Sequence, residues 1–375
     1  IALLFPKVIH DHFVTLITLK GKDNHHDNKR SGVGSTAFAV SAGRAMESLR
    51  SDRKPIIVDE IANSLFNIKH LNSSALIDLK WKLLVLIFRF KDYWPLSKSN
   101  YMKRLVIFQD GIAIRTKYID ESINDILNHK KGMSTTHHHE HGDDDEDDDD
   151  DDDDIQQLVI LGAGLDSRVL RLENILNNNN VITYEIDFPK MFQLKWELFE
   201  NFGFLKPTGD KYKIIESDFS SSTSSNIEIS SKLSHDWSKQ LMNSGYNKNK
   251  SSIWIIEGVT GYLKENEIIE LLDIINQVSN GKNNYIISTF ISEKNDFFIG
   301  SYGEATALNI HTFQTNNPCQ YFSYNLNHHI NDTVQQSTCM EVFSIGELSS
   351  MFNIQSSSIK DYDHSYRLVK ALRKS

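Results

Sequence analysis

A glycine-rich turn behind a short apolar run is the first feature of the sequence that could do chemistry. The run LVIL at 158–161 is followed by GAGLDSR, in which Gly162 and Gly164 let the backbone bend sharply and let a ligand approach closely. Where dinucleotide-binding turns carry a third glycine this chain has Ser167, and the neighbouring Asp166 would repel a pyrophosphate. The turn favours a cationic, phosphate-free ligand such as the sulfonium of S-adenosylmethionine. An ordinary tight turn with Asp166 as a helix cap is the alternative.

Two carboxylates follow the next apolar run, in the sequence YEIDFP at 184–189. Acidic side chains about 20 residues after a glycine turn, at the end of a second strand, accept hydrogen bonds from the ribose hydroxyls of a bound nucleoside. Glu185 and Asp187 lie on the same side of a strand that continues through both. We therefore expect both to contact a ribose, with a solvated strand end as the alternative.

Two later motifs place further polar and aromatic groups after strands. In SDF, Asp218 would accept a hydrogen bond from an adenine amino group while Phe219 packs on the ring, although an Asp after a strand is common. In IIEGVTGYL at 255–263, Glu257 lies where the methionine part of the cofactor or the acceptor is expected. Tyr262 is the candidate on the acceptor side, and simple packing is its alternative.

The elements that must position these residues form an alternating pattern. Short apolar runs are typical of buried parallel strands, and helical stretches between them indicate a doubly wound, Rossmann-like α/β sheet. Ligands bind at the carboxyl ends of the strands in such sheets. The segment 292–338 shows no clear period. The expected strands are 158–161, 181–186, 212–216, 252–257, 284–290 and 366–372, and the expected helices between or after them are 166–177, 189–199, 264–279 and 345–352.

The first 130 residues are predicted to be mostly helical. Phe38, Ala42, Ala45 and Leu49 recur at a helical spacing. Further helices are expected at 59–69, 76–90 and 109–127. The predicted organisation is a poorly structured tail over 1–34 and one domain over 35–375, made of a helical lead-in (35–130), a disordered acidic insertion (131–154) and a cofactor-binding α/β core (155–375).

The charge of the chain is concentrated in that insertion. The net charge is -10, and residues 137–154 alone hold 11 Asp and 2 Glu. The remaining chain has only a small positive excess, so we expect no nucleic-acid partner. A tract of like charges predicts a solvated, disordered loop, with weak metal binding by its histidines as the alternative. We expect no functional metal site.

The apolar runs are too short to cross a membrane, since LLVLIF at 83–88 lies between charged residues. We therefore expect no membrane partner and a cytoplasmic location. Cys319 and Cys339 are too few for a disulfide framework or a Cys-rich zinc site. They are predicted to be two buried thiols in a reducing compartment.

Taken in order, the motifs ILGAGLDSR, YEIDFP, SDF and IIEGVTGYL resemble the leucine carboxyl methyltransferase-like family of S-adenosylmethionine-dependent methyltransferases. STAFAVSAGRAMES and IRTKYIDESI, which contains Arg115, resemble its helical lead-in. The resemblance implies a mostly parallel, seven-stranded sheet of the class I methyltransferase type and S-adenosyl-L-methionine as the cofactor. It also implies that Arg115 pairs with the cofactor carboxylate, as guanidinium groups do. The implied cofactor contacts are Arg115, Gly162, Asp187, Asp218, Phe219 and Glu257.

The predicted activity is methyl transfer to a carboxylate or another oxygen nucleophile. An ionised carboxylate needs no general base, which agrees with the lack of a Ser-His-Asp or Cys-His arrangement among the motifs. The acceptor, a small molecule or a protein C-terminus, is left open, as is the oligomeric state. A nicotinamide-dependent oxidoreductase and a non-catalytic interaction protein that uses the acidic tract are the alternative functions.

Overall fold

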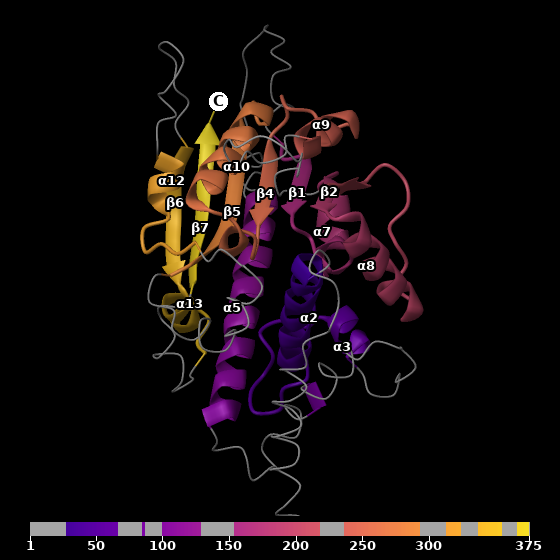
Figure 1. Ribbon diagram of the computed structural model, residues 1–375, viewed down its shortest axis with the longest axis vertical. Helices are drawn as coiled ribbons and strands as arrows, with labels where there is room; N and C mark the ends of the chain where they lie inside the picture. The colour runs from indigo at the N-terminus through magenta and orange to yellow at the C-terminus, as the bar shows by residue number, and fades with distance from the viewer. Residues whose placement is uncertain are drawn as a thin grey trace, which may run out of the picture. The chain divides into compact units, whose positions relative to one another are not determined.

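The chain divides into two compact units, Ile1–Ala113 and Ile114–Ser375 (Figure 1). The boundary falls inside helix α5 (Asn100–Asn128), and each unit is described by itself. The single domain predicted over 35–375 stays a prediction. The computed structural model describes residues 28–66, 85–86, 100–128, 154–217, 236–292, 313–323, 337–354 and 366–374.

The first unit contains α2 (Asn28–Ser48), α3 (Glu60–Leu65) and the beginning of α5. α2 begins at Asn28, inside the segment predicted to be a tail, and it buries the predicted apolar stripe at Phe38, Ala42 and Ala45. α3 begins after Asp59, whose side chain accepts the backbone N–H of Ala62 at 2.9 Å and so caps the helix. Most of the helix predicted over 76–90 lies outside the described residues.

The second unit is built on a seven-stranded sheet in the order β3-β2-β1-β4-β5-β7-β6. The pairs among the first five strands are parallel, and β7 is antiparallel to both β5 and β6. This confirms the predicted doubly wound, mostly parallel seven-stranded sheet. The strands are β1 (Gln157–Leu161), β2 (Ile182–Asp187), β3 (Tyr212–Glu216), β4 (Ser252–Ile256), β5 (Asn283–Ile291), β6 (Ser337–Ser344) and β7 (Tyr366–Lys374).

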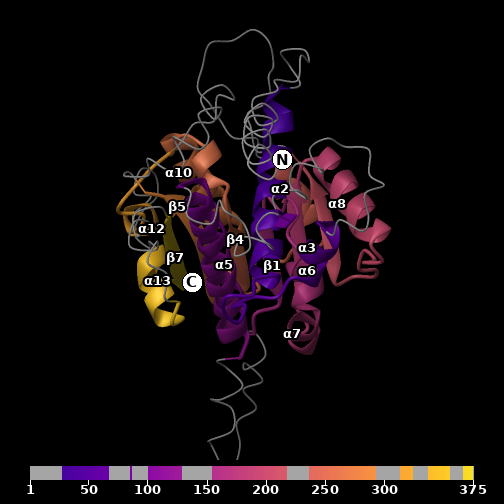
Figure 2. The same cartoon turned by 90° about the horizontal axis from the view of Figure 1, so that it is seen from below.

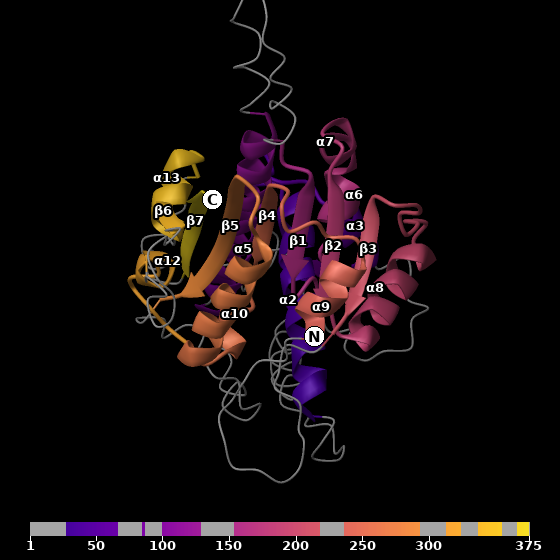
Figure 3. The same ribbon diagram turned by 90° about the horizontal axis from the view of Figure 1, so that it is seen from above.

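Helices cover both faces of this sheet. Figures 2 and 3 show α10 (Glu265–Val278) on one face and the part of α5 that belongs to this unit, residues 114–128, on the other. The helix predicted over 166–177 is two short helices, while α8 has Pro189 in its first turn as expected. None of the described helices combines the length and apolar character that a membrane crossing requires. The remaining helices are α6 (Arg168–Arg171), α7 (Glu173–Asn178), α8 (Pro189–Asn201), α9 (Asp236–Asn243), η5 (Thr260–Tyr262), α10 (Glu265–Val278), α12 (Cys319–Ser323) and α13 (Ile345–Met351).

The core lies around the two central strands. Every residue of β1 and β4 is buried, as continuous apolar runs in a parallel sheet should be. Trp254 of β4 makes edge-to-face contacts with Trp237 and Tyr246, and α10 adds Leu271 and Ile275 to the same cluster. Burial of a leucine or isoleucine side chain contributes about 1.5–3 kcal/mol, so this cluster stabilises the two central strands.

The edge of the sheet holds two features that the sequence did not indicate. β6 was not predicted, and a register shift between Cys339 and Glu341 interrupts its pairing with β7. Cys339 forms a disulfide with Cys319 of α12, with the two Cα atoms 5.5 Å apart. The prediction of two separate buried thiols is therefore wrong. The packing of α12 against β6 brings together two residues 20 positions apart, which the sequence pattern does not reveal.

Candidate functional site

The glycine turn joins the ends of three neighbouring strands. After β1, Gly162 and Gly164 adopt φ values of +64° and +49°, in the left-handed region that favours glycine. The backbone N–H of Gly162 donates to the carbonyl of Ile186 in β2 at 2.8 Å. A Cβ on Gly162 would lie 2.6 Å from Cγ2 of Val259, in the loop after β4. A side chain at this position would therefore force the Val259 side chain to move.

Asp187 lies against the same turn. Its Oδ2 accepts the backbone N–H of Gly164 at 2.6 Å, and its Oδ1 accepts the N–H of Phe188 at 2.7 Å. Two backbone donors fix the direction of the carboxylate, and the side chain is buried at the carboxyl end of β2. The structure thus brings this predicted residue to the glycine turn.

Glu185 has a different environment from the one expected for a ribose contact. Its carboxylate accepts from Lys195 Nζ at 2.8 and 2.7 Å and from the hydroxyl of Tyr212 at 2.6 Å. Glu185 and Lys195 are both 0% exposed. Burial raises the pKa of Glu185, and the Lys195 ammonium acts in the opposite direction. Protein groups enclose this carboxylate, so we exclude Glu185 from the proposed ligand contacts.

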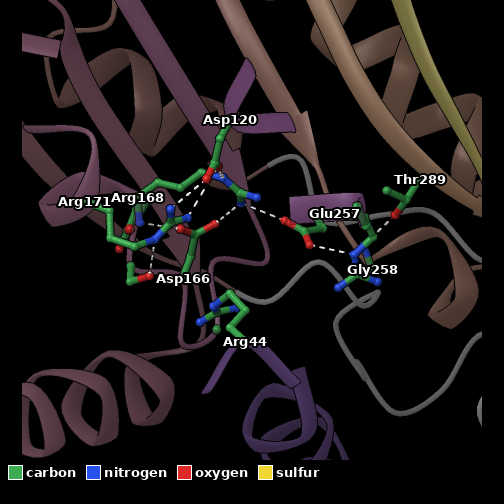
Figure 4. A network of polar contacts seen from close by, with 12 residues as sticks. Arg44, Asp120, Asp166, Arg168, Arg171, Glu257, Gly258 and Thr289 are labelled. Carbon is green, nitrogen blue, oxygen red and sulfur yellow. Dashed lines mark hydrogen bonds and ion pairs between the residues drawn. The ribbon is translucent and has the colours of Figure 1, made fainter. Parts of the chain in front are cut away.

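A network of ion pairs includes the residues that directly follow the turn (Figure 4). Three guanidinium groups and three carboxylates alternate in it, so their formal charges balance. The members come from α5, from the segment after β1 and from the residue that follows β4. They are Arg115, Asp120, Asp166, Arg168, Arg171 and Glu257.

Arg168 is the centre of this network. Its Nε donates to Asp120 at 2.6 Å, and its Nη1 donates to Glu257 Oε2 at 2.7 Å and to Asp166. The second oxygen of Glu257, Oε1, accepts from Nε of Arg115 at 2.7 Å. Burial opposes the charge of Arg168, but Asp166, Glu257 and Asp120 together raise its pKa well above the ordinary value. Arg168 therefore stays charged wherever the protein is folded.

Asp166 lies one residue before Ser167, which is the N-cap of α6 and makes no side-chain cap hydrogen bond. Its Oδ1 accepts the backbone N–H of Arg168 at 2.7 Å, at the beginning of α6, and its other oxygen pairs with the Arg168 guanidinium. Asp166 thus binds the first N–H of the helix from the position before the N-cap, which differs from the cap predicted as the alternative. Both oxygens of Asp166 already contact Arg168, so we do not include a contact between Asp166 and a sulfonium in the proposed site.

The loop that carries Glu257 is fixed to β5. The N–H of Gly258 donates to Oγ1 of Thr289 at 2.9 Å, and the hydroxyl of Thr260 donates to the carbonyl of Thr289 at 2.7 Å. Tyr262 ends the short helix η5 in this loop and is partly exposed. Its place on the acceptor side stays a prediction. Asp218 and Phe219 lie outside the described residues.

The sequence reasoning missed three members of the network. Arg168 is the last residue of ILGAGLDSR, and Asp120 lies within IRTKYIDESI, so both belong to motifs that carry the family resemblance. Asp120 and Glu257 lie 48 and 89 residues from Arg168, which left no local signal for these two pairings. Arg171 pairs with Asp120 at 2.6 Å and carried no signal of its own. Among the side chains that the structure describes, no group of three or more His, Cys, Asp or Glu could hold a metal ion.

Comparison with known proteins agrees with the motifs. Residues 144–276, just over a third of the chain, match the sequence model of the leucine carboxyl methyltransferase family. This confirms the resemblance to that family that the motifs indicated. The match includes the glycine turn, Asp187 and Glu257, and it ends within α10.

Curated relatives extend the likeness beyond that segment. A "Putative S-adenosyl-L-methionine-dependent methyltransferase" of Mycobacterium marinum is 26% identical over 249 residues, which cover 66% of this chain and 61% of the relative. A protein of the same description from Mycobacterium sp. (strain JLS) is 27% identical over 257 residues, with 68% and 67% covered. The chain therefore spans about three fifths of the first relative, and both relatives are described as methyltransferases.

Solved structures give a weaker likeness. A putative methyltransferase from Thermobifida fusca YX has a TM-score of 0.46 at 9% identity, with 89% of this chain and 94% of that chain covered. A DUF574 family protein from Streptomyces avermitilis has the same TM-score at 10% identity, with 76% and 96% covered. Scores of this size support no conclusion about function.

Proposed function

We propose that this chain is an S-adenosyl-L-methionine-dependent methyltransferase whose acceptor is a carboxylate on a small molecule or at a protein C-terminus. One observation carries the proposal. At the carboxyl ends of β2, β1 and β4, a glycine turn lies between the Asp187 carboxylate and the Arg115–Glu257 ion pair. The family match and the relatives' names support the same activity.

The donor set fits this cofactor. Arg115 offers a guanidinium to an α-carboxylate, and Glu257 offers a carboxylate to an α-ammonium. Asp187 offers an acceptor to ribose hydroxyls beside the glycine turn. In addition, Arg115, Arg168 and Arg171 are each paired with a carboxylate. A pyrophosphate would therefore find no excess of positive charge among them, which argues against a dinucleotide.

The residues of the site act by binding and placement. When bound, S-adenosylmethionine supplies an activated methyl group on its sulfonium. Arg115 and Glu257 would hold the amino-acid end of the cofactor, and Asp187 would hold its ribose. An ionised carboxylate acceptor has no proton to give up, so no side chain here has to act as a base. Placement and exclusion of water can supply about 7 kcal/mol of the barrier reduction.

Binding of labelled S-adenosylmethionine to purified protein, measured by equilibrium dialysis, tests the proposal. Asp187→Asn keeps the size of the side chain and removes its charge, and we expect at least a tenfold weaker affinity, or about 1.4 kcal/mol. Asp210→Asn is the control, because Asp210 is a fully solvated carboxylate that pairs with Lys213. Absence of binding to the parent protein would refute the activity, and tighter binding of a nicotinamide dinucleotide would favour the oxidoreductase alternative.

A further inference from the structure

Arg168 forms an ion pair with Glu257, the residue that the proposed function assigns to binding of the ligand's ammonium group. Each oxygen of Glu257 accepts a hydrogen bond from a different guanidinium group. Arg115 donates to Oε1 and Arg168 donates to Oε2, both at 2.7 Å. The Glu257 side chain is 12% exposed, whereas that of Arg168 is 2% exposed. Glu257 is thus the more accessible partner, and Arg168 is the anchored one.

Two carboxylates other than Glu257 hold Arg168 in place. Asp120 accepts from its Nε at 2.6 Å, and Asp166 accepts from both its guanidinium and its backbone N–H. Asp120 is itself held by Arg171 at 2.6 Å. A planar guanidinium bound on two sides cannot rotate away from Glu257. The orientation of the Glu257 carboxylate therefore depends on the more deeply buried guanidinium of Arg168.

The charges give Arg168 a second effect on the site. Without Arg168, the carboxylates of Asp166 and Glu257 would lose a common counter-charge, and Arg115 would be drawn more strongly toward Glu257. A ligand that carries both an ammonium and a carboxylate would then have to separate a tighter Arg115–Glu257 pair. With Arg168 present, Glu257 is already neutralised on one oxygen, which leaves Arg115 more available to a ligand carboxylate.

We propose that Arg168 is a positioning residue that fixes Glu257 and keeps Arg115 available, so that the two together receive the amino-acid end of the cofactor. This inference rests on the proposed function. It predicts a specific signature, since Arg168 should matter for ligands with an amino-acid group and should matter little for the nucleoside part, which Asp187 and the glycine turn receive.

The test compares two ligands by isothermal titration calorimetry: S-adenosylhomocysteine, and methylthioadenosine, which lacks the amino-acid group. For Arg168→Gln we expect the affinity for S-adenosylhomocysteine to fall by about tenfold or more, and that for methylthioadenosine by less than about threefold. Arg168→Lys keeps the charge but loses the planar guanidinium. Its affinity for S-adenosylhomocysteine should lie between those of the parent protein and of Arg168→Gln. Lys213→Gln removes a cation that pairs with the solvated Asp210 outside the network, and it should leave the ratio of the two affinities unchanged.

A double-mutant cycle with Glu257→Gln isolates the interaction. In the Glu257→Gln background, substitution of Arg168 should cost no further affinity for S-adenosylhomocysteine. Equal losses for both ligands, or additive losses in the cycle, would overturn the positioning role while the cofactor assignment stands. A parent protein that binds neither ligand would refute the proposed function and the inference with it. If Arg168→Gln does not fold, Arg168→Lys decides the same comparison.

Discussion

At the scale of single residues, the site depends on a glycine that has no substitute. Gly162 combines a left-handed backbone with a distance of 2.6 Å between its would-be Cβ and Val259. Either property alone disfavours a side chain. The close contact with Val259 also links the turn after β1 to the loop that carries Glu257. Conformation and contact can be separated experimentally because Gly203 has a φ of +84° and no heavy atom within 4 Å of its Cβ position.

Gly162→Ala should lower the free energy of unfolding by more than Gly203→Ala does. Both substitutions force alanine into the left-handed region at a cost of about 1–2 kcal/mol. Gly162→Ala adds overpacking against Val259, worth about 1–3 kcal/mol. Urea denaturation followed by circular dichroism measures the difference, and Val259→Ala should recover the second part only. Equal losses at both glycines would show that the close approach to Val259 is not real.

At the scale of elements, a buried ion pair ties β2 to α8 and β3. Lys195 of α8 and Tyr212 of β3 both contact the Glu185 carboxylate of β2. Trp196 packs edge-on against Tyr212 and Phe199 at the same place. The strand that ends at Asp187 is thereby fixed two residues before the site. A carboxylate predicted to bind ligand instead holds the strand that positions its neighbour.

Lys195→Met should destabilise the fold by about 3–5 kcal/mol, because it leaves the buried Glu185 charge without a counter-charge, with only the neutral Tyr212 hydroxyl as a donor. The double variant Lys195→Met/Glu185→Leu should recover most of that loss. Burial already raises the pKa of Glu185, and loss of the ammonium should raise it further. A raised folded-state pKa of an acid lowers stability as pH rises, so the loss should be larger at pH 8 than at pH 5. Equal losses at the two pH values would contradict a charged Glu185.

Helix α10 contains a second acid with an altered pKa. Burial, and next the charge of Glu270, raise the pKa of Asp273 to about 6 from 3.8. The folded protein therefore binds this proton more tightly than the unfolded chain does, and Asp273 lowers stability as pH rises from about 4 to about 6.

Asp273→Asn should therefore be more stable than the parent at pH 7, by on the order of 1 kcal/mol after solvent screening is allowed for. The gain should vanish near pH 4. Thermal unfolding at the two pH values measures it, with Asp125→Asn on the exposed face of α5 as the control. A gain that is the same at both pH values would contradict the raised pKa.

At the scale of the whole molecule, sequence patterns predict the parallel part of the second unit well. Continuous apolar runs locate β1, β2, β3, β4 and β5, and the glycine turn, Asp187 and Glu257 follow from their positions after strands. What the sequence did not show depends on long-range pairing. β6 has an interrupted register, the disulfide needs the folded edge of the sheet, and the partners of Arg168 come from α5 and from the residue after β4.

The central claim is that Asp187, the glycine turn and the Arg115–Glu257 pair receive one ligand. A crystal structure of the protein with S-adenosylhomocysteine tests it most directly. The account predicts the ligand carboxylate at Arg115, its amino group at Glu257 and its ribose hydroxyls at Asp187. A ligand bound elsewhere, or one whose amino-acid end lies away from Arg115 and Glu257, would contradict it.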